Sequence, residues 1–267
     1  MRELPSELYD AEYFLSDWCE GFDEFRAGEG VSQLKKREVA LLGPSPGVRV
    51  LDAGCGRGEV LLECARRGAS VAGADYAEAA VAIARETLAA VEGSEVVRSD
   101  LTALPWPDDS FDRVLLGDVI EHLTDEQGRA GLAELARVLS PGGRIVIHTA
   151  PNLLFLRFGW PPTRQALRLL GRGEVARRLD EGIAQSKRYH VNEQSVYSLR
   201  RSLRRAGFAH SRAWVARDVL RSEGYRLTAG VTAGSPLLAG LAQLASARPV
   251  RLFLGNDLYA IGELPIR

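Results

Sequence analysis

The sequence predicts an α/β fold in which helices surround a mainly parallel sheet. Between residues 47 and 151, short apolar runs rich in β-branched residues alternate with segments of helical periodicity. Repeated units of strand and helix form parallel strands joined by right-handed crossovers. The chain has 267 residues, of which 46% are hydrophobic, and it contains no internal repeat. Its length supports a substantial core, and the missing repeat excludes solenoids and propellers.

Seven segments are predicted to be strands, because each is a short apolar run next to turn residues. They are residues 48–52, 70–75, 95–100, 113–117 and 144–149, followed after a long interval by 208–215 and 258–261. We expect the last two strands to complete the sheet, with about residues 218–250 inserted between them.

Three helices are expected between the first five strands. Residues 59–67 carry apolar side chains at helical spacing and end at Gly68, a residue typical of helix C-termini. Residues 77–91 are rich in alanine, and residues 127–139 place their leucines on one face. The turn Pro141-Gly142-Gly143 then leads into the fifth strand.

The segments on either side of these units are predicted to be helical. Residues 7–42 are rich in aromatic side chains, and we expect them to cover one mouth of the site. Residues 152–191 form an arginine-rich helical cap that Pro161-Pro162 interrupts. Asn192 is the expected N-cap of a helix that ends at Gly207.

The chain therefore divides into four parts. We expect an N-terminal helical cover at 1–45, a cofactor-binding core at 46–151 and a basic helical cap at 152–191. Residues 192–267 complete the core sheet and contain the insertion.

Charge is distributed unevenly although the net charge is only −1. Residues 1–156 carry 15 basic and 27 acidic side chains, whereas residues 157–226 carry 16 basic and 6 acidic ones. The basic part favours an anionic small molecule, a lipid-linked one or a peripheral contact with a membrane surface. The alternative is that its arginines lie on solvated helix faces. Nucleic acid is not expected as a partner, because no basic motif is interleaved with aromatic residues.

Other features of the sequence indicate a cytoplasmic protein. The three cysteines show neither a disulfide framework nor the paired spacing of metal ligands, and the N-terminus does not resemble a targeting signal. The longest apolar run, residues 236–245, is far shorter than the roughly 20 residues of a membrane-spanning helix. We expect a monomer or a homodimer.

The motif VLDAGCGRG at residues 50–58 places a glycine loop after the first strand. A dinucleotide fingerprint would require G-x-G-x-x-G, but Glu59 and Leu61 occupy the two positions where the third glycine would stand. Asp52 would also repel a pyrophosphate. S-adenosylmethionine has no phosphate, and it carries positive ammonium and sulfonium groups that suit Asp52. Its carboxylate suits the N–H groups of a glycine turn at a helix start.

Acidic residues at the next two strand ends support a nucleoside site. Asp75 lies 21 residues after Gly54, where a carboxylate can accept hydrogen bonds from both ribose hydroxyls. Asp100 and Leu101 suit the adenine edge, since the carboxylate accepts from the amino group and a backbone N–H meets a ring nitrogen. The alternative for Asp100 is a turn cap.

These motifs resemble those of class I S-adenosylmethionine-dependent methyltransferases. VLDAGCGRG corresponds to the first motif of that family and LPWPDDSFDRVLLGDVIEHL to its fourth-strand region, so the similarity covers mainly residues 47–151. The resemblance implies a Rossmann-like, doubly wound sheet of seven strands in the order 3-2-1-4-5-7-6. The implied cofactor contacts are Asp52, Gly54, Cys55, Gly56, Gly58, Asp75, Tyr76, Asp100, Leu101, Gly117 and Asp118. Tyr76 would lie near the adenosine, and Gly117 and Asp118 beside the methionyl group.

Within the family, Asp118-x-x-Glu121-His122 resembles O-methyltransferases that act on quinone precursors. Some of these use a divalent ion there, but Glu121 could equally cap a helix and His122 could pack under the sheet, so we assign no metal ligand. If the acceptor is a hydroxyl, a histidine or carboxylate near the strand ends can remove its proton. The candidates are Glu121, His122, His148 and His190.

The predicted function is therefore transfer of a methyl group from S-adenosylmethionine to a small molecule, with a hydroxyl as the favoured acceptor. In-line alignment of acceptor and methyl carbon supplies most of the acceleration in such a reaction. Two alternatives remain open, namely an NAD(P)-dependent oxidoreductase on a similar sheet and a noncatalytic module that binds S-adenosylmethionine.

Overall fold

The computed structural model describes residues 4–16, 19–216 and 249–266. Its centre is a seven-stranded sheet in the order β3-β2-β1-β4-β5-β7-β6, as expected. The strands are β1 (Arg49–Ala53), β2 (Ser70–Asp75), β3 (Glu95–Arg98), β4 (Phe111–Gly117), β5 (Leu139–Thr149), β6 (His210–Val215) and β7 (Leu258–Glu263). The first five strands pair in parallel, and β7 pairs antiparallel with both β5 and β6. The predicted insertion at 218–250, including the apolar run at 236–245, lies outside the described residues except for its last two positions.

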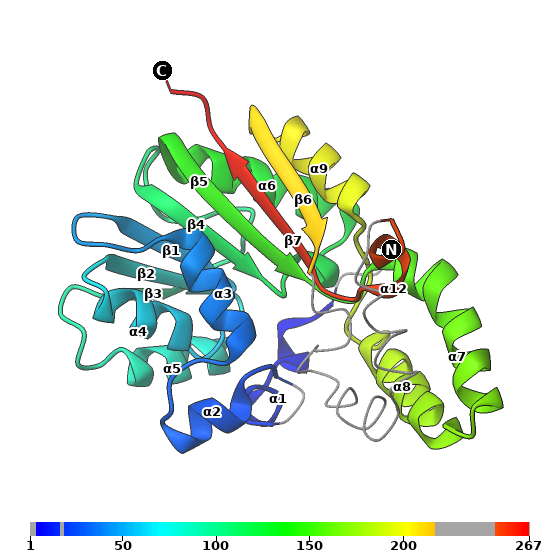
Figure 1. Cartoon of the computed structure of the whole chain (residues 1–267). Coiled ribbons are helices and arrows are strands. Elements are labelled where there is room, and N and C mark those ends of the chain that lie inside the picture. Colours follow the sequence, from blue (N-terminus) through cyan, green and yellow to red (C-terminus); the bar gives the residue numbers. More distant parts are fainter. Residues whose placement is uncertain (1–3, 17–18, 217–248, 267) are drawn as a thin grey trace.

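Helices cover both faces of the sheet (Figure 1). One face packs against α3 (Gln33–Leu42), α4 (Glu59–Arg66) and α5 (Glu78–Thr87), and the other against α6 (Asp125–Val138) and α9 (Val196–Arg205). Successive side chains of a strand point to opposite faces of the sheet, which explains why each strand contributes to both packed layers. Within β1, Val50 is buried on the first face while Leu51 and Ala53 are buried on the second.

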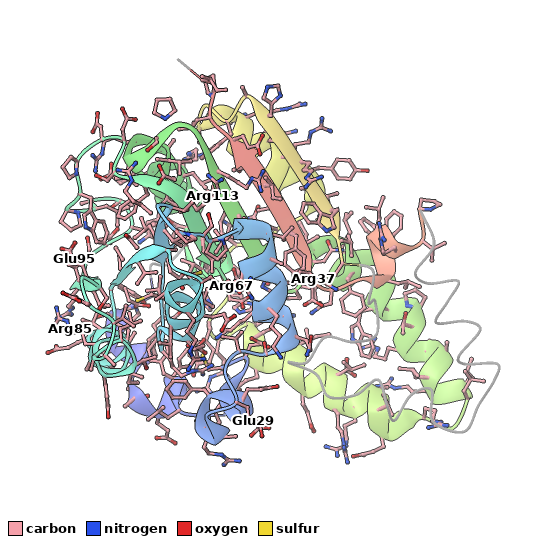
Figure 2. The ribbon with its side chains drawn as sticks, turned by 60° about the vertical axis from the view of Figure 1, so that its left-hand side comes forward. Glu29, Arg37, Arg67, Arg85, Glu95 and Arg113 are labelled. Atoms are coloured by element: carbon pink, nitrogen blue, oxygen red, sulfur yellow. The ribbon has the colours of Figure 1, made fainter. Side chains whose placement is uncertain are left out.

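Two arginines fix helix α3 to the sheet, one at its C-terminal end and one in its middle. These are Arg113 of β4 and Arg37 of α3, both labelled in Figure 2. The Arg113 guanidinium donates a hydrogen bond to the carbonyl of Leu42 (3.0 Å), and the Arg37 guanidinium lies over the Tyr259 ring of β7. This attachment places the inner face of α3 beside the ends of β1, β4 and β5.

The N-terminal cover contains η1 (Ser6–Leu8), α1 (Ala11–Phe14) and α2 (Phe22–Ala27) as well as α3. The cap is a hairpin that projects from the sheet at the lower right of Figure 1. It consists of η3 (Phe155–Gly159), α7 (Trp160–Leu169) and α8 (Gly173–Ser186). The short α12 (Arg251–Leu254) lies next to η3, where the Phe253 carbonyl leaves no room for a side chain at Gly159.

Two expectations about helix ends were wrong. Pro161-Pro162 does not interrupt the cap helix, because both prolines lie in the first turn of α7, where a missing N–H is tolerated. The hairpin turns instead at Gly171, which has a positive φ. The N-cap of α9 is Ser195 and not Asn192, since the Ser195 hydroxyl accepts a hydrogen bond from the Ser198 N–H in a capping box.

Candidate functional site

A cavity of about 310 Å³ lies where the first five strands end, under the N-terminal cover. Open α/β sheets bind ligands at this edge, because parallel strands bring their carboxyl ends together there. All but one of the predicted site residues line it: Asp52, Gly54, Cys55, Gly56, Asp75, Tyr76, Asp100, Leu101, Gly117, Asp118, Glu121, His122, His148 and His190. Gly58 is the exception, since it is the N-cap of α4 behind the loop.

The glycine loop has a backbone that requires glycine. Gly54, Gly56 and Gly58 all have positive φ, and a Cβ atom on Gly54 would lie 2.2 Å from Cγ2 of Val119. Several N–H groups of the loop already have partners, because those of Gly54 and Cys55 donate to the Ala74 carbonyl. The loop therefore shapes the cavity, and only part of its N–H groups are available to a bound carboxylate.

Asp75 faces the glycine loop from the end of β2. Its two carboxylate oxygens accept hydrogen bonds from the N–H groups of Gly56 and Ala77, both at 3.0 Å. Burial raises the pKa of Asp75 above its ordinary value, although these bonds to backbone N–H groups oppose the shift. Asp75 also lines the cavity, so its carboxylate is in reach of a ligand there.

The end of β3 supplies a turn beside the cavity. The strand ends at Arg98, so Asp100 follows it and does not end it as predicted. Asp100 accepts hydrogen bonds from the N–H (2.8 Å) and the hydroxyl (2.6 Å) of Thr102, which is the turn-cap arrangement. It nevertheless lines the cavity together with Leu101, so the turn holds both at its rim.

Glu38 of α3 is a buried site residue that the sequence analysis missed. It is 2% exposed, and its Oε1 lies 3.1 Å from where a Cβ atom on Gly117 would stand. Burial raises the pKa values of both Glu38 and Asp52, and Glu38 adds to the shift of Asp52. Two carboxyl groups thus share one end of the cavity, where a cationic ligand group would stabilise their charged forms.

A second missed group joins the cover to the glycine loop. Arg57, which is 1% exposed, donates hydrogen bonds to the main-chain carbonyls of Phe14 (2.9 Å) and Glu20 (2.6 Å). Glu59 pairs with both Arg57 and Lys35, the latter at 2.6 Å. Burial alone would raise the pKa of Glu59, but these two cations lower it below its ordinary value. The cover is thereby anchored at the cavity wall.

Asp118 and His148 form an ion pair at the ends of β4 and β5. Asp118 has a φ of 52°, and its Oδ1 lies 2.8 Å from Nδ1 of His148. Burial would lower the pKa of His148, but the contact with Asp118 and the nearby Glu38 and Asp257 outweigh burial and raise it. The pair therefore favours a protonated His148 and an ionised Asp118.

Glu121 and His122 lie in the turn η2 (Ile120–His122) that follows β4. Glu121 accepts a hydrogen bond from the Thr149 hydroxyl (2.8 Å), and burial together with the charge of Asp118 raises its pKa. Nδ1 of His122 lies 2.9 Å from both the Tyr9 hydroxyl and the Tyr189 carbonyl. The His190 ring meets the His122 ring edge to face, with centroids 4.9 Å apart.

Two groups of side chains bring potential ligand atoms within 4.8 Å of one another: Glu121, His122 and His190, and Glu38, Asp118 and His148. In the first group the Tyr189 carbonyl already occupies one nitrogen of His122, and in the second the His148–Asp118 pair holds a proton. We assign no metal ligand in this cavity.

Several polar atoms at the cavity point to a ligand that donates hydrogen bonds. Glu38 Oε1, His190 Nδ1 and Asn256 Oδ1 are buried without a hydrogen-bond partner among the described residues, and all three side chains line the cavity. Buried polar atoms are costly when unpaired. This arrangement suits S-adenosylmethionine, which brings an ammonium, an amino group and two ribose hydroxyls.

The arginines of the cap do not face this cavity. No arginine among the described residues 152–191 lines it. Arg164 and Arg168 pair with Asp180 of α8, while Arg177 and Arg178 pair with Glu174. Within the part of the chain that the structure describes, no helix is long and apolar enough to cross a bilayer.

Part of this chain is similar in sequence to known methyltransferases. A family described as "Methyltransferase domain" matches residues 50–143. A demethylmenaquinone methyltransferase of Clavibacter sepedonicus is 40% identical over 119 residues, covering 44% of this chain and 48% of the relative. A ubiquinone/menaquinone biosynthesis C-methyltransferase of Geobacter sulfurreducens is 36% identical over 119 residues, covering 42% and 46%. The chain thus spans about half the length of the curated relatives it matches.

A solved structure supports the fold over nearly the whole chain. A phosphoethanolamine N-methyltransferase of Haemonchus contortus, in complex with phosphomonomethylethanolamine and S-adenosylhomocysteine, superposes with a TM-score of 0.61. The superposition covers 97% of this chain and 57% of the Haemonchus chain. The two sequences are 15% identical, so the likeness concerns the fold alone. The sheet order agrees with this fold, and residues 50–143 match the methyltransferase-domain family.

Proposed function

We propose that the chain transfers a methyl group from S-adenosylmethionine to a hydroxyl-bearing small molecule. The observation that carries this proposal is the order of acidic groups around one cavity. Asp52 lies near the end of β1, Asp75 ends β2 and Asp100 follows β3. Glu38 adds a carboxyl oxygen that has no hydrogen-bond partner among the described residues, at the end near Asp52. These acidic groups would attract the positive methionyl ammonium of the donor and tolerate its neutral nucleoside. They would repel the negative pyrophosphate of a dinucleotide cofactor.

Each part of the donor has a candidate partner. Asp75 would accept from the ribose hydroxyls, and Asp100 with Leu101 would hold the adenine edge. Asp52 and Glu38 would face the ammonium beside Gly117. Lys35, which also lines the cavity, and the remaining N–H groups of the glycine loop would face the carboxylate.

The bound cofactor supplies an electrophilic methyl carbon, whose bond to sulfur breaks as the new bond to the acceptor forms and leaves its electron pair on sulfur. The chain itself must align the acceptor and remove its proton. A ring hydroxyl, once deprotonated, activates both its own oxygen and the adjacent ring carbon. The proposal therefore accommodates an O-methyl product and also the C-methyl product named for the Geobacter relative.

The charge of the cavity favours a neutral acceptor. The charge of Asp118 acts on both His122 and His190, and no arginine of the described part of the cap lines the cavity to attract an anion. We therefore propose a phenol- or hydroquinone-like molecule, with or without a lipid tail, in preference to a phosphate or carboxylate.

The proposal is tested by calorimetry and by a search for the acceptor. S-adenosylmethionine and S-adenosylhomocysteine should both bind with a stoichiometry of one, and NAD⁺ and NADP⁺ should not bind. A donor labelled in the methyl group should then label a member of a panel of phenols and hydroquinones. Binding of a nicotinamide nucleotide without S-adenosylhomocysteine would overturn the cofactor assignment. Binding of donor without transfer to any hydroxylated compound would favour a noncatalytic module.

A further inference from the structure

The surroundings of His122 determine which of its ring nitrogens carries the proton. Nδ1 lies 2.9 Å from the Tyr189 carbonyl oxygen. A carbonyl oxygen only accepts hydrogen bonds, so this contact is favourable when Nδ1 carries hydrogen. The carbonyl is held in place, because the N–H groups of Val191 and Asn192 donate to the Glu121 carbonyl at 2.9 and 3.1 Å.

The ring of His122 is neutral in this environment. Burial lowers its pKa below the ordinary value, although main-chain contacts with Tyr189 and Asp118 and the charge of Asp118 oppose that shift. A neutral imidazole with its proton on Nδ1 has an unprotonated Nε2. Since the two nitrogens lie on opposite sides of the ring, Nε2 points away from the Tyr189 carbonyl.

Tyr9 adds a contact from the N-terminal cover. Its hydroxyl oxygen lies 2.9 Å from the same Nδ1, across 113 residues of sequence. When Nδ1 is the donor, this oxygen accepts and the tyrosine proton is left to donate elsewhere. The ring of Tyr9 is held by edge contacts with Tyr13, Tyr76 and His122, at centroid distances of 5.1–5.7 Å.

The other candidate bases are less suited to accept a proton. His148 already holds one in its pair with Asp118. Burial and the neighbouring His122 lower the pKa of His190 to about 3, which makes it a very weak base. Glu121 is engaged by the Thr149 hydroxyl.

We propose that Nε2 of His122 removes the acceptor proton, and that the Tyr189 carbonyl and the Tyr9 hydroxyl hold the tautomer that makes this possible. The proposal rests on the proposed methyl transfer. The acceptor O–H bond breaks, its proton passes to Nε2, and its electron pair forms the bond to the methyl carbon. His122 then leaves the reaction as an imidazolium that must release one proton to solvent. Tyr9 is a positioning residue, and the cover that carries it completes the catalytic site.

The chain has only four histidines, which makes the tautomer directly measurable. ¹⁵N NMR of the full chain labelled at histidine, saturated with S-adenosylhomocysteine at pH 7, should show one neutral ring with protonated Nδ1 and bare Nε2. That signal should vanish in His122→Asn. His148 should appear as an imidazolium in the same spectrum. A protonated Nε2 on His122 in the wild-type protein would overturn the proposal.

Matched variants separate the base from its positioning group. His122→Asn keeps a donor near Tyr189 but lacks the base, so turnover of an identified hydroxylated acceptor should fall by a factor of about 10² or more. Tyr9→Phe should lower kcat about tenfold and increase the fraction of the other His122 tautomer. His210→Asn on the exposed edge strand and Tyr197→Phe on α9 are controls that should change neither.

The outcomes distinguish this inference from the proposed function. If S-adenosylhomocysteine does not bind, the cofactor assignment fails. If it binds equally to wild type, His122→Asn and Tyr9→Phe but turnover is unaffected, the methyl transfer stands and the role of His122 is refuted. A loss of turnover in Tyr9→Phe with an unchanged tautomer would remove Tyr9 from the positioning role.

Discussion

At the scale of single residues, Asp75 combines a structural and a proposed binding role. It accepts hydrogen bonds from the glycine loop and from the start of α5, and it also lines the cavity. Replacing it with alanine should weaken S-adenosylhomocysteine binding tenfold or more, a loss of about 1.4 kcal/mol or more. Calorimetry measures the change, with Asp108→Ala on the surface as control. Unchanged affinity in Asp75→Ala would contradict the assigned ribose site.

Glu38 provides an independent test of the methionyl end. Its Oε1 has no hydrogen-bond partner among the described residues and lies against Gly117. Glu38→Gln keeps the shape but removes the charge, so affinity for S-adenosylmethionine should fall between threefold and tenfold, which is about 1 kcal/mol. The exposed Glu86→Gln on α5 is the matched control. If affinity is unaffected, the ammonium lies elsewhere.

The sequence could identify those site residues whose position follows from the order of strands along the chain. Asp52 and Asp75 come at strand ends, and parallel strands bring such ends together, so their meeting could be predicted. Glu38 and Tyr9 reach the cavity from the cover, whose docking depends on contacts distant in sequence. A signal did exist for Glu38, since it precedes Val39 on the buried side of α3, where acidic side chains are rare.

At the scale of elements, α9 shows why helix boundaries are harder to predict than helices. Both Asn192 and Ser195 are good capping residues, and only the geometry of the chain leaving the cap selects Ser195. The Ser195→Ala variant should lose the bond to the Ser198 N–H and destabilise the fold by about 1 kcal/mol. Thermal unfolding measures this, with Ser202→Ala in the middle of α9 as control. An equal loss in both variants would mean that the cap contributes nothing specific.

At the scale of the whole molecule, the buried acids make stability depend on pH. Burial and the charge of Asp118 raise the pKa of Glu121 to about 8, so the folded chain holds a proton that the unfolded chain releases above about 4.5. His148 likewise keeps its proton in the fold above its ordinary pKa. Because the folded state binds more protons, its stability falls as pH rises.

The fall of stability with rising pH can be tested on the protein without ligand. Its midpoint of thermal unfolding should decrease between pH 7 and pH 8, and Glu121→Gln should make that decrease smaller. Glu86→Gln should leave the slope unchanged. A midpoint that stays constant or rises over this interval in the wild-type protein would show that Glu121 is ionised in the fold.

The topology of the sheet was more predictable from the sequence than the surroundings of the cap arginines. Alternating strands and helices predicted a parallel sheet, and the resemblance of the motifs supplied the seven-stranded order that the structure confirms. The sequence predicted that the cap is helical and basic, but not the direction in which its arginines point. Whether an arginine faces a ligand or an acid on the next helix depends on how α7 and α8 pack, and here Asp180 and Glu174 face the arginines.

The guanidinium of Arg57 has a consequence for protein engineering. A cover taken from a relative would bring its own carbonyl groups, but they would find no donor unless the recipient loop carried an arginine at this position. A loop grafted without its cover would leave a buried cation with too few acceptors, which costs several kcal/mol. The cover and the loop therefore form a single exchangeable module, and chimaeras that split them should fail although each half looks self-contained in sequence.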